Sequence, residues 1–448
     1  MSEPFASGGD KPRVIIVGGG FAGLETAKGL AGADAEVVLL DRKNHHVFQP
    51  LLYQVATASL SPESISAPIR SVLGENSDCQ VVLSNVVGID ADRKRVEVET
   101  GTVPYDYLVL AVGVRHDYFG NDEWEAIAPG LKTIEDATEI RRRMLLAFES
   151  AEHEADDDAR RGALTFAVVG GGPTGVELAG AIKAIASRTL PREYRNIDTA
   201  TARVILFEGG PRVLPSFPES LSARAEADLK RLGVEVSVDT FVTALDPHGV
   251  RVGDEYIPAQ NVFWAAGVKA SPLLQSLGAE TDRAGRVIVN RDLSVPGRPE
   301  VFVLGDAASY TPDGDSNALP GVAQVAMQMG RYAARVIREE VGRGSSAARE
   351  TAFVYKDKGS MAIIGKNKAV AAVGRHKMTG FVAWLLWAGV HIAFLVNFRN
   401  RLQVLLSWAW SWVLDSHDAR LIVGESRLRI RKAQGAGFEP TMPAEGSG

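Results

Sequence analysis

The sequence contains one cysteine, Cys79, in 448 residues. A single thiol cannot form an intramolecular disulfide, so disulfide-stabilised secreted proteins and enzymes that exchange electrons through a cysteine pair are excluded. Cys79 is also far from the glycine motifs described below. We expect it to be a half-buried structural residue in a protein of a reducing compartment.

The sequence also lacks signals for targeting, metals and nucleic acids. Residues 1–12 are polar, without the apolar core of a secretory signal or the arginines of a transit peptide. No group of His, Cys, Asp and Glu has the spacing of metal ligands, and no segment is typical of nucleic-acid binding. We therefore predict no metal ion and no nucleic-acid partner. We also predict that the main body of the protein faces a bacterial cytoplasm.

Two glycine motifs are the most informative feature that is present, Gly18–Gly23 and Gly170–Gly175. Each follows an apolar run typical of a buried strand, Val14–Val17 and Phe166–Val169, and each precedes a predicted helix. A glycine turn between strand and helix lets the backbone approach a pyrophosphate, which the helix N-terminal amides bind. Two such motifs predict an α/β protein with two Rossmann-like dinucleotide-binding domains and chemistry that passes between two dinucleotides.

Each motif has an acidic residue at the end of the following predicted strand. Asp41 follows the first motif at the usual distance of about 20 residues, and Glu208 follows the second after a longer connection. Such carboxylates accept hydrogen bonds from ribose hydroxyls, and they repel the 2′-phosphate of NADP. Glu208 therefore favours NAD, although Arg212 nearby weakens this preference. The alternative is that both acids are only polar strand ends facing solvent.

Two further apolar segments are predicted strands, Tyr107–Gly113 and Val301–Ala308. The order of these segments resembles the two-dinucleotide-binding-domain flavoproteins, the glutathione-reductase-like superfamily. The resemblance implies non-covalent FAD at the first motif and NADH or NADPH at the second. The residues it implies for FAD are Gly18, Gly20, Phe21, Ala22, Gly23, Asp41, Arg42, Ala111, Gly113, Asp306 and Ala323. The residues it implies for the nicotinamide nucleotide are Gly170, Gly172, Pro173, Thr174, Gly175, Glu177 and Glu208.

A pair of glutamines indicates the electron acceptor. Gln324 and Gln328 are four residues apart on one predicted helix, so both amides can face one bound group. A neutral amide donates to a quinone carbonyl without placing a charge in an apolar pocket. The segment that contains these glutamines, together with Phe48–Ala56, resembles the type II NADH:quinone oxidoreductases over about residues 13–416. The structural alternative is that the two glutamines, like most such pairs on a helix, are only solvated or bonded to backbone.

The resemblance implies a respiratory enzyme that pumps no protons and passes hydride from NADH through FAD to menaquinone or ubiquinone. We expect Glu177 to position the nicotinamide or to handle a proton, although it also complements a helix N-terminus. Lys377 is a weaker candidate for the mouth of the quinone site, because it is equally suited to lipid phosphates. Two alternatives stay open: an NADH-responsive redox sensor, and a ferredoxin or rubredoxin reductase.

The C-terminal region indicates a membrane surface. Five of the seven tryptophans lie within residues 381–414, and residues 361–432 contain eleven Lys or Arg against three acids. Asn400, Gln403, Ser407 and Ser411 recur at helical spacing and leave leucines and tryptophans opposite. These features favour monotopic insertion over a transmembrane hairpin or a soluble dimer interface. The resemblance adds a homodimer.

The expected domain organisation has five parts. Residues 12–116 and 291–345 form the FAD domain, and residues 117–290 form the NADH domain, with a charged hinge at 149–162. Residues 350–432 are predicted to be the membrane-anchoring region, and residues 433–448 a disordered tail.

Overall fold

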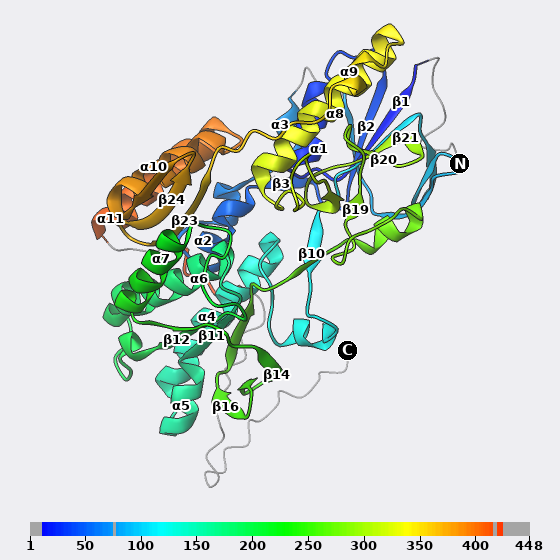
Figure 1. The fold of residues 1–448 in the computed structure, drawn as a ribbon. Coiled ribbons are helices and arrows are strands. Elements are labelled where there is room, and N and C mark those ends of the chain that lie inside the picture. Colours follow the sequence, from blue (N-terminus) through cyan, green and yellow to red (C-terminus); the bar gives the residue numbers. More distant parts are fainter. Residues whose placement is uncertain (1–10, 75–77, 415–418, 424–448) are drawn as a thin grey trace, which may run out of the picture.

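The computed structural model describes residues 11–74, 78–414 and 419–423. It has two α/β bodies joined by crossing strands, with a third, C-terminal layer against the second body (Figure 1). The predicted tail at 433–448 lies outside the described residues, as does most of the N-terminal segment.

The first body is built on a six-stranded sheet in the order β20-β21-β9-β1-β2-β5. All its pairings are parallel except that of β20 with β21. The strands are β1 (Arg13–Val17), β2 (Glu36–Asp41), β5 (Gln80–Leu83), β9 (Tyr107–Leu110), β20 (Ser294–Val295) and β21 (Arg298–Val303). Helices α1 (Phe21–Gly29) and α8 (Ala323–Arg343) pack against each other beside this sheet. Since β21 pairs with β9, the chain returns to the first body as the two-part domain requires.

The second body is a parallel sheet in the order β13-β12-β11-β17. Every residue of β11 and β17 is buried, as their near-continuous apolar sequences predict. The strands are β11 (Thr165–Val169), β12 (Arg203–Phe207), β13 (Val234–Ser237) and β17 (Asn261–Trp264). The helices are α4 (Ile134–His153), α5 (Asp157–Ala163), α6 (Pro173–Ala184) and α7 (Glu219–Leu232).

The hinge predicted at residues 149–162 is wrong. These residues end α4 and form most of α5, and α5 packs on α4 and β11 within the second body. The chain crosses between the bodies instead at β10 (Val114–His116) and β18 (Val268–Ala270), which pair antiparallel. The chain therefore re-enters the first body before residue 291, where we predicted the boundary. Leu274 and Leu277 already lie in the core of the first body.

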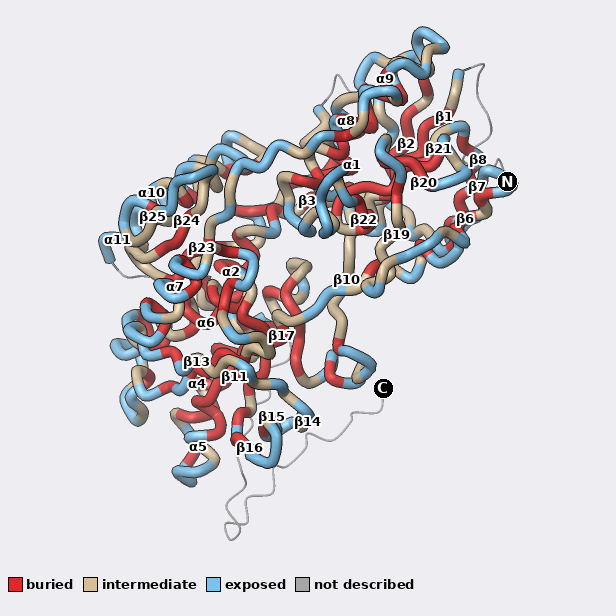
Figure 2. The backbone as a smooth tube through the Cα atoms, in the orientation of Figure 1, coloured by how far each residue is buried: buried red, intermediate tan, exposed pale blue. Residues whose placement is uncertain are grey.

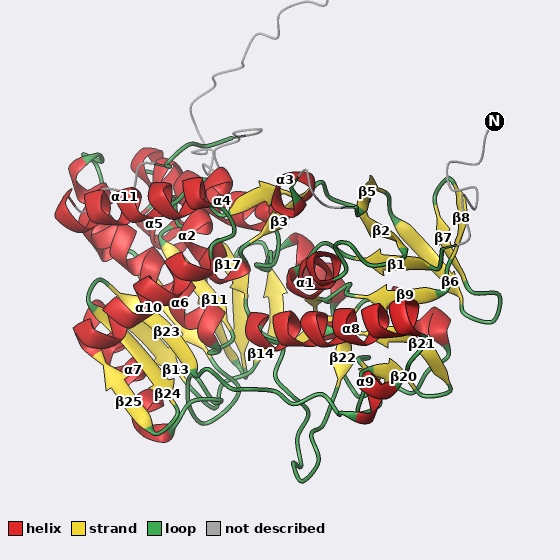
Figure 3. Ribbon diagram, turned by 90° about the horizontal axis from the view of Figure 1, so that it is seen from above, coloured by secondary structure: helices red, strands yellow, loops and turns green. Residues whose placement is uncertain are grey.

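The C-terminal layer contains a sheet that we did not predict. Its strands β23 (Ser360–Gly365), β24 (Lys368–Val373) and β25 (His376–Thr379) are antiparallel and precede α10 (Gly380–Phe394) and α11 (Phe398–Leu414). Figure 3 shows this sheet beside α7 and α10, and α6 packs on β23. The layer shares one hydrophobic core with the second body, so it is not a separate unit.

Helix α11 packs on the protein through one face, which contains Asn400 and Val404, and leaves many apolar residues exposed on the other. Asn400 is 6% exposed and donates to the Ser66 carbonyl at 3.0 Å, whereas Leu406 is 60% exposed and Trp410 57% exposed. Figure 2 shows few buried residues in α10 and α11, in contrast to the two sheets. Within the described ranges, no helix has both the length and the apolar character needed to cross a membrane.

The remaining strands and helices are short. The strands are β3 (His45–Val47), β4 (Ser66–Pro68), β6 (Val86–Asp90), β7 (Arg95–Val98), β8 (Gly101–Pro104), β14 (Val242–Asp246), β15 (Gly249–Val252), β16 (Glu255–Pro258), β19 (Val287–Ile288) and β22 (Ala308–Ser309). The helices are α2 (Leu52–Ala56), α3 (Ile69–Leu73) and α9 (Ala347–Glu350). Of these elements, β3 and α2 contribute residues to the lining of the cavity described next.

Candidate active site

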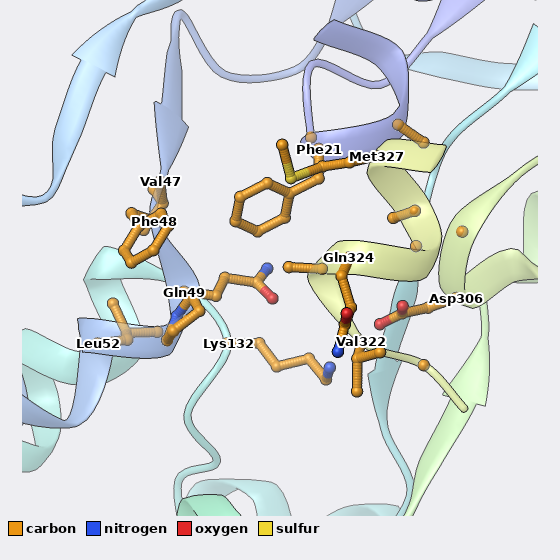
Figure 4. A pocket seen from close by; sticks show the side chains of 18 of the residues that line it. Phe21, Val47, Phe48, Gln49, Leu52, Lys132, Asp306, Val322, Gln324 and Met327 are labelled. Carbon is orange, nitrogen blue, oxygen red and sulfur yellow. The ribbon is translucent and has the colours of Figure 1, made fainter. Parts of the chain in front are cut away.

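A cavity of about 710 Å³ lies where the two bodies and the C-terminal layer meet. Figure 4 shows side chains from several distant segments that point into it, including Phe21, Lys132 and Asp306. The first glycine motif, the start of α6 and the end of α10 all contribute lining residues. Segments that are far apart in sequence therefore share one site.

The first glycine motif forms one wall, and its backbone needs glycine at defined points. Gly18 has φ +103°, and a Cβ there would lie 2.4 Å from the Ala111 carbonyl oxygen. A Cβ at Gly23 would lie 1.8 Å from the Gly18 carbonyl oxygen, so this glycine lets α1 pack close to the turn. The Gly19 amide donates to the Asp41 carboxylate at 2.5 Å. This bond joins the motif to the predicted ribose carboxylate.

The second glycine motif repeats this geometry at the N-terminus of α6. Gly170 has φ +110°, and a Cβ at Gly175 would lie 1.8 Å from the Gly170 carbonyl oxygen. The Glu208 carboxylate accepts from the Gly171 amide at 2.6 Å and from the Gly210 amide at 2.7 Å. Two motifs of similar sequence thus have matching backbone arrangements.

The Arg212 guanidinium is not an available cation beside the ribose carboxylate. Its guanidinium donates to the carbonyls of Phe217 and Pro215 and to the Ser222 hydroxyl. These three bonds hold the turn before α7. The expected weakening of the preference for NAD is therefore not supported by the position of Arg212.

The cavity contains most of the residues predicted for FAD and a smaller share of those predicted for the nicotinamide nucleotide. The lining residues that we predicted for a nucleotide are Gly18, Gly20, Phe21, Ala22, Asp41, Arg42, Ala111, Gly113, Pro173, Thr174, Glu177, Asp306 and Ala323. The predicted nucleotide residues outside the lining are Gly23, Gly170, Gly172, Gly175 and Glu208. Most of the first motif lines this cavity, whereas most of the second lies outside it.

The residues present fit a bound FAD. Gly20 caps α1 without a side-chain hydrogen bond, so the first amides of α1 remain available to a pyrophosphate. Buried His46 has its Nδ1 3.1 Å from the Gly19 carbonyl oxygen, and desolvation lowers the pKa of His46 to about 4. A neutral imidazole therefore supports the turn beneath the first motif.

Glu177 projects from α6 into the same cavity. Desolvation raises the pKa of its carboxyl to about 8, although the Ile363 amide, which donates to it at 3.3 Å, acts in the opposite direction. A pKa near neutrality suits a group that takes up or releases a proton. The second motif thus places one titratable side chain beside the first.

The two predicted glutamines have backbone partners. Gln324 donates to the Gly359 carbonyl at 2.9 Å and accepts from the Lys358 amide at 3.1 Å. Gln328 donates to the Lys356 carbonyl and accepts from the Lys356 amide, both at 3.0 Å. Gln324 lines the cavity, but Gln328 does not. The prediction that both amides face one bound group is therefore wrong for Gln328, because its amide holds the segment before β23.

Lys377 lies away from the cavity. It is an exposed residue of β25, where it pairs with Ala372, and it is not among the lining residues. The predicted position at the mouth of a quinone site is not what the structure shows. A short strand, which we did not predict, directs this segment along the outer edge of the C-terminal sheet.

Sequence reasoning missed Lys132. The α4 capping box, in which Thr133 and Asp136 bond to each other's backbone amides, places Lys132 at the cavity wall. Figure 4 shows its side chain extending toward Gln324 and Asp306. Desolvation lowers the pKa of Lys132, and the charge of Asp306 acts against that shift. The capping box was readable in the sequence, but its position beside the cavity was not.

A chain of hydrogen bonds from α11 to the cavity was also missed. The Trp408 indole donates to the Gln54 side-chain oxygen at 2.7 Å, and the Gln54 amide donates to the Tyr53 hydroxyl at 2.7 Å. Tyr53 and His391 line the cavity, and desolvation lowers the pKa of His391 to about 4. Segment Phe48–Ala56 was recognised only as part of a resemblance.

Comparisons with known protein families agree with this arrangement. Residues 12–330 match the family described as pyridine nucleotide-disulphide oxidoreductase, and residues 358–415 match the NDH2 C-terminal domain. The structure is similar to that of NDH2 from Plasmodium falciparum in complex with NADH, with a TM-score of 0.83 and 20% identity. The match covers 92% of this chain and 100% of the other. At this identity, the similarity shows the shared fold.

Two curated relatives are more similar in sequence, and both come from Mycobacterium tuberculosis. The type II NADH:quinone oxidoreductase Ndh is 43% identical, and the match covers 100% of this chain and 98% of the relative. The type II NADH:quinone oxidoreductase NdhA is 44% identical over 97% of this chain and 95% of the relative. Nearly full coverage of both proteins agrees with the predicted resemblance. The chain belongs to the type II NADH:quinone oxidoreductase family, whose members are FAD-dependent NADH dehydrogenases.

Proposed function

We propose that this chain oxidises NADH at the second glycine motif and reduces a membrane quinone from the side of α10, without pumping protons. The observation that carries this proposal is the shared cavity. The first motif, Glu177 of α6, and Val390, His391 and Phe394 of α10 all line it. One cavity therefore faces both a nucleotide domain and the C-terminal layer.

The first motif is proposed to hold FAD. Bound FAD supplies the chemistry that accepts a hydride and releases two electrons. The α1 amides would bind the pyrophosphate, Asp41 the adenosine ribose and Asp306 the ribityl chain. The protein contributes binding, orientation and exclusion of water, because hydride transfer depends on close alignment.

The second motif is proposed to bind NADH. The α6 amides would contact the pyrophosphate and Glu208 the adenosine ribose. Pro173 and Thr174 line the cavity at the start of α6, so the nicotinamide end of a nucleotide bound there would enter the site. Glu177 then lies where it can hold or release a proton beside the reacting groups.

The quinone is proposed to enter past the end of α10. Among the glutamines, Gln324 is the candidate for contact with the ring, because it lines the cavity and Gln328 does not. Gln328 would instead position residues 356–359, through which the chain enters the C-terminal layer. Exposed Lys377 would bind lipid phosphates rather than the quinone.

The outward apolar face of α10 and α11 is proposed to insert into one leaflet. The exposed apolar residues of these helices are Phe381, Val382, Leu385, Phe394, Phe398, Leu402, Leu405, Leu406, Trp410, Trp412, Val413 and Leu414. Such a surface, with excess basic charge nearby, suits an anionic membrane. We place it at the cytoplasmic face of a bacterial inner membrane, and we propose a homodimer.

Anaerobic flavin absorbance tests this function. Addition of NADH to the purified protein should bleach the flavin within the mixing time of a stopped-flow instrument, and a quinone should then restore the absorbance. Bleaching that persists after quinone would contradict the quinone reductase. A long-lived bleached state would favour the redox sensor, whereas reoxidation only by a ferredoxin or rubredoxin would favour the protein-acceptor reductase.

A further inference from the structure

An exposed aromatic side chain lies beside the proposed NADH site. Phe241 is 70% exposed, so most of its ring surface is free to contact a ligand. It lies between β13 and β14, at the carboxyl end of β13. Nothing in the mechanism above uses this residue.

The loop that carries Phe241 is fixed to the loop that carries Glu208. The Glu208 amide donates to the Ser237 carbonyl at 2.9 Å, and the amides of Asp239 and Thr240 donate to the carbonyls of Gly210 and Glu208 at the same distance. A Cβ at Gly209 would lie 2.6 Å from the Phe241 ring. The ring therefore lies against a glycine next to the ribose carboxylate.

The strand order gives the direction of the nucleotide. The pyrophosphate motif follows β11, the ribose carboxylate follows β12, and Phe241 follows β13, the next strand in the sheet. A nucleotide that extends from the motif past Glu208 therefore brings its base to the carboxyl end of β13. An exposed aromatic ring there offers a flat apolar face to a purine.

We infer that Phe241 is the platform on which the adenine of NADH stacks, an inference that rests on the proposed NADH site. Phe241 contributes affinity for the adenosine half of the nucleotide, while Glu208 selects between NAD and NADP. The two residues therefore have separable effects. Loss of the ring weakens NADH and NADPH alike, because both contain adenine.

Binding of 5′-AMP measured by calorimetry on the flavin-loaded protein tests this inference. Phe241→Ala should raise the Kd for 5′-AMP roughly five- to tenfold, and Phe241→Tyr should restore it. Turnover should show the same increase in KM for NADH at unchanged kcat. Reduced nicotinamide mononucleotide, which lacks adenosine, should be oxidised equally well by wild type and Phe241→Ala.

A matched control is Tyr256→Ala, which removes another exposed aromatic from the same body. An unchanged 5′-AMP affinity in Phe241→Ala would overturn the inference and would favour contact of this ring with another protein. Equal loss of activity with the mononucleotide would also overturn it, because the effect would then not require adenine. If NADH does not reduce the flavin of the wild type, the proposed function itself fails.

Discussion

The two glycine motifs have nearly the same backbone but different surroundings. Gly18 and Gly170 share a left-handed conformation, and Asp41 and Glu208 each accept a backbone amide of their motif. Most of the first motif lines the cavity, whereas most of the second lies outside it. Local sequence therefore sets the backbone of each motif. The packing around each motif is the difference that the proposed function assigns to a resident cofactor and a substrate that exchanges.

The largest expected effect comes from replacing the glycine of each motif that lies closest to neighbouring backbone with alanine. Gly23→Ala should yield protein without flavin and lower the free energy of unfolding by about 3 kcal/mol, because the Cβ meets backbone at 1.8 Å. Gly175→Ala should stay yellow but lose flavin reduction by NADH. The ratio of flavin absorbance to protein concentration measures flavin content. Anaerobic addition of NADH measures flavin reduction.

A glycine with open space provides the control for this pair. Gly342 in α8 has no atom within 4 Å of an added Cβ, so Gly342→Ala should change neither flavin content nor reduction. If Gly175→Ala lost the flavin while Gly23→Ala kept it, the assignment of the two nucleotides would be reversed.

A smaller effect is expected from the ribose carboxylates. Glu208→Gln should raise the ratio of kcat/KM for NADPH to that for NADH about tenfold, because a charge no longer repels the 2′-phosphate. Asp41→Asn should reduce retention of FAD and leave this ratio unchanged. Steady-state kinetics with both nucleotides measures the ratio, and an unchanged ratio in Glu208→Gln would refute the assignment of Glu208.

A charge placed in the outward apolar face of α10 and α11 should affect only the half of the reaction that reduces quinone. Leu405→Glu should weaken binding to anionic vesicles by about tenfold, since it places a charge in the apolar face of α11. Bleaching by NADH should be normal, because the second motif is unaltered. Leu83→Glu is the control, since Leu83 is 62% exposed but lies in the first body. Equal vesicle binding by Leu405→Glu and wild type in a flotation assay would contradict monotopic insertion.

The smallest effect concerns Glu177, which lies on α6 after the second motif and lines the cavity beside the first. Its pKa is raised from 4.5 to about 8, so the folded protein keeps a proton that the unfolded chain releases. The free energy of unfolding should therefore fall as pH rises from about 4.5 to about 8 and level off above that. Glu177→Gln should remove this contribution and raise the unfolding midpoint at pH 9 by about 3 °C relative to wild type.

Comparison of unfolding midpoints at pH 5 and pH 9 measures this contribution. Exposed Glu123→Gln is the control and should follow the wild type at both values. If Glu177→Gln and wild type had the same pH dependence, the carboxyl of Glu177 would already be ionised in the folded protein at neutral pH.

The sequence predicted both sheets and both motifs because their signals are local. A buried parallel strand reads as an apolar run, and a tight turn requires glycine at fixed spacing. The three-stranded C-terminal sheet was missed, since its strands are short and precede a segment dominated by tryptophan. The hinge at 149–162 was mistaken for a linker because acidic residues typical of a linker also cap α5, where Asp156 accepts from the Ala159 amide.

The sequence by itself determined two strand–turn–helix glycine motifs, the carboxylate that bonds to each motif, and an apolar C-terminal region rich in tryptophan, because spacing and composition carry that information. Only the tertiary structure decided which motif lines the cavity and which face of α11 is outward. It also directed the amides of Gln324 and Gln328 to backbone and brought Lys132 and Tyr53 into the cavity. These features depend on contacts between segments far apart in the chain. Their physical reason is that burial and hydrogen-bond partners are properties of the packed molecule.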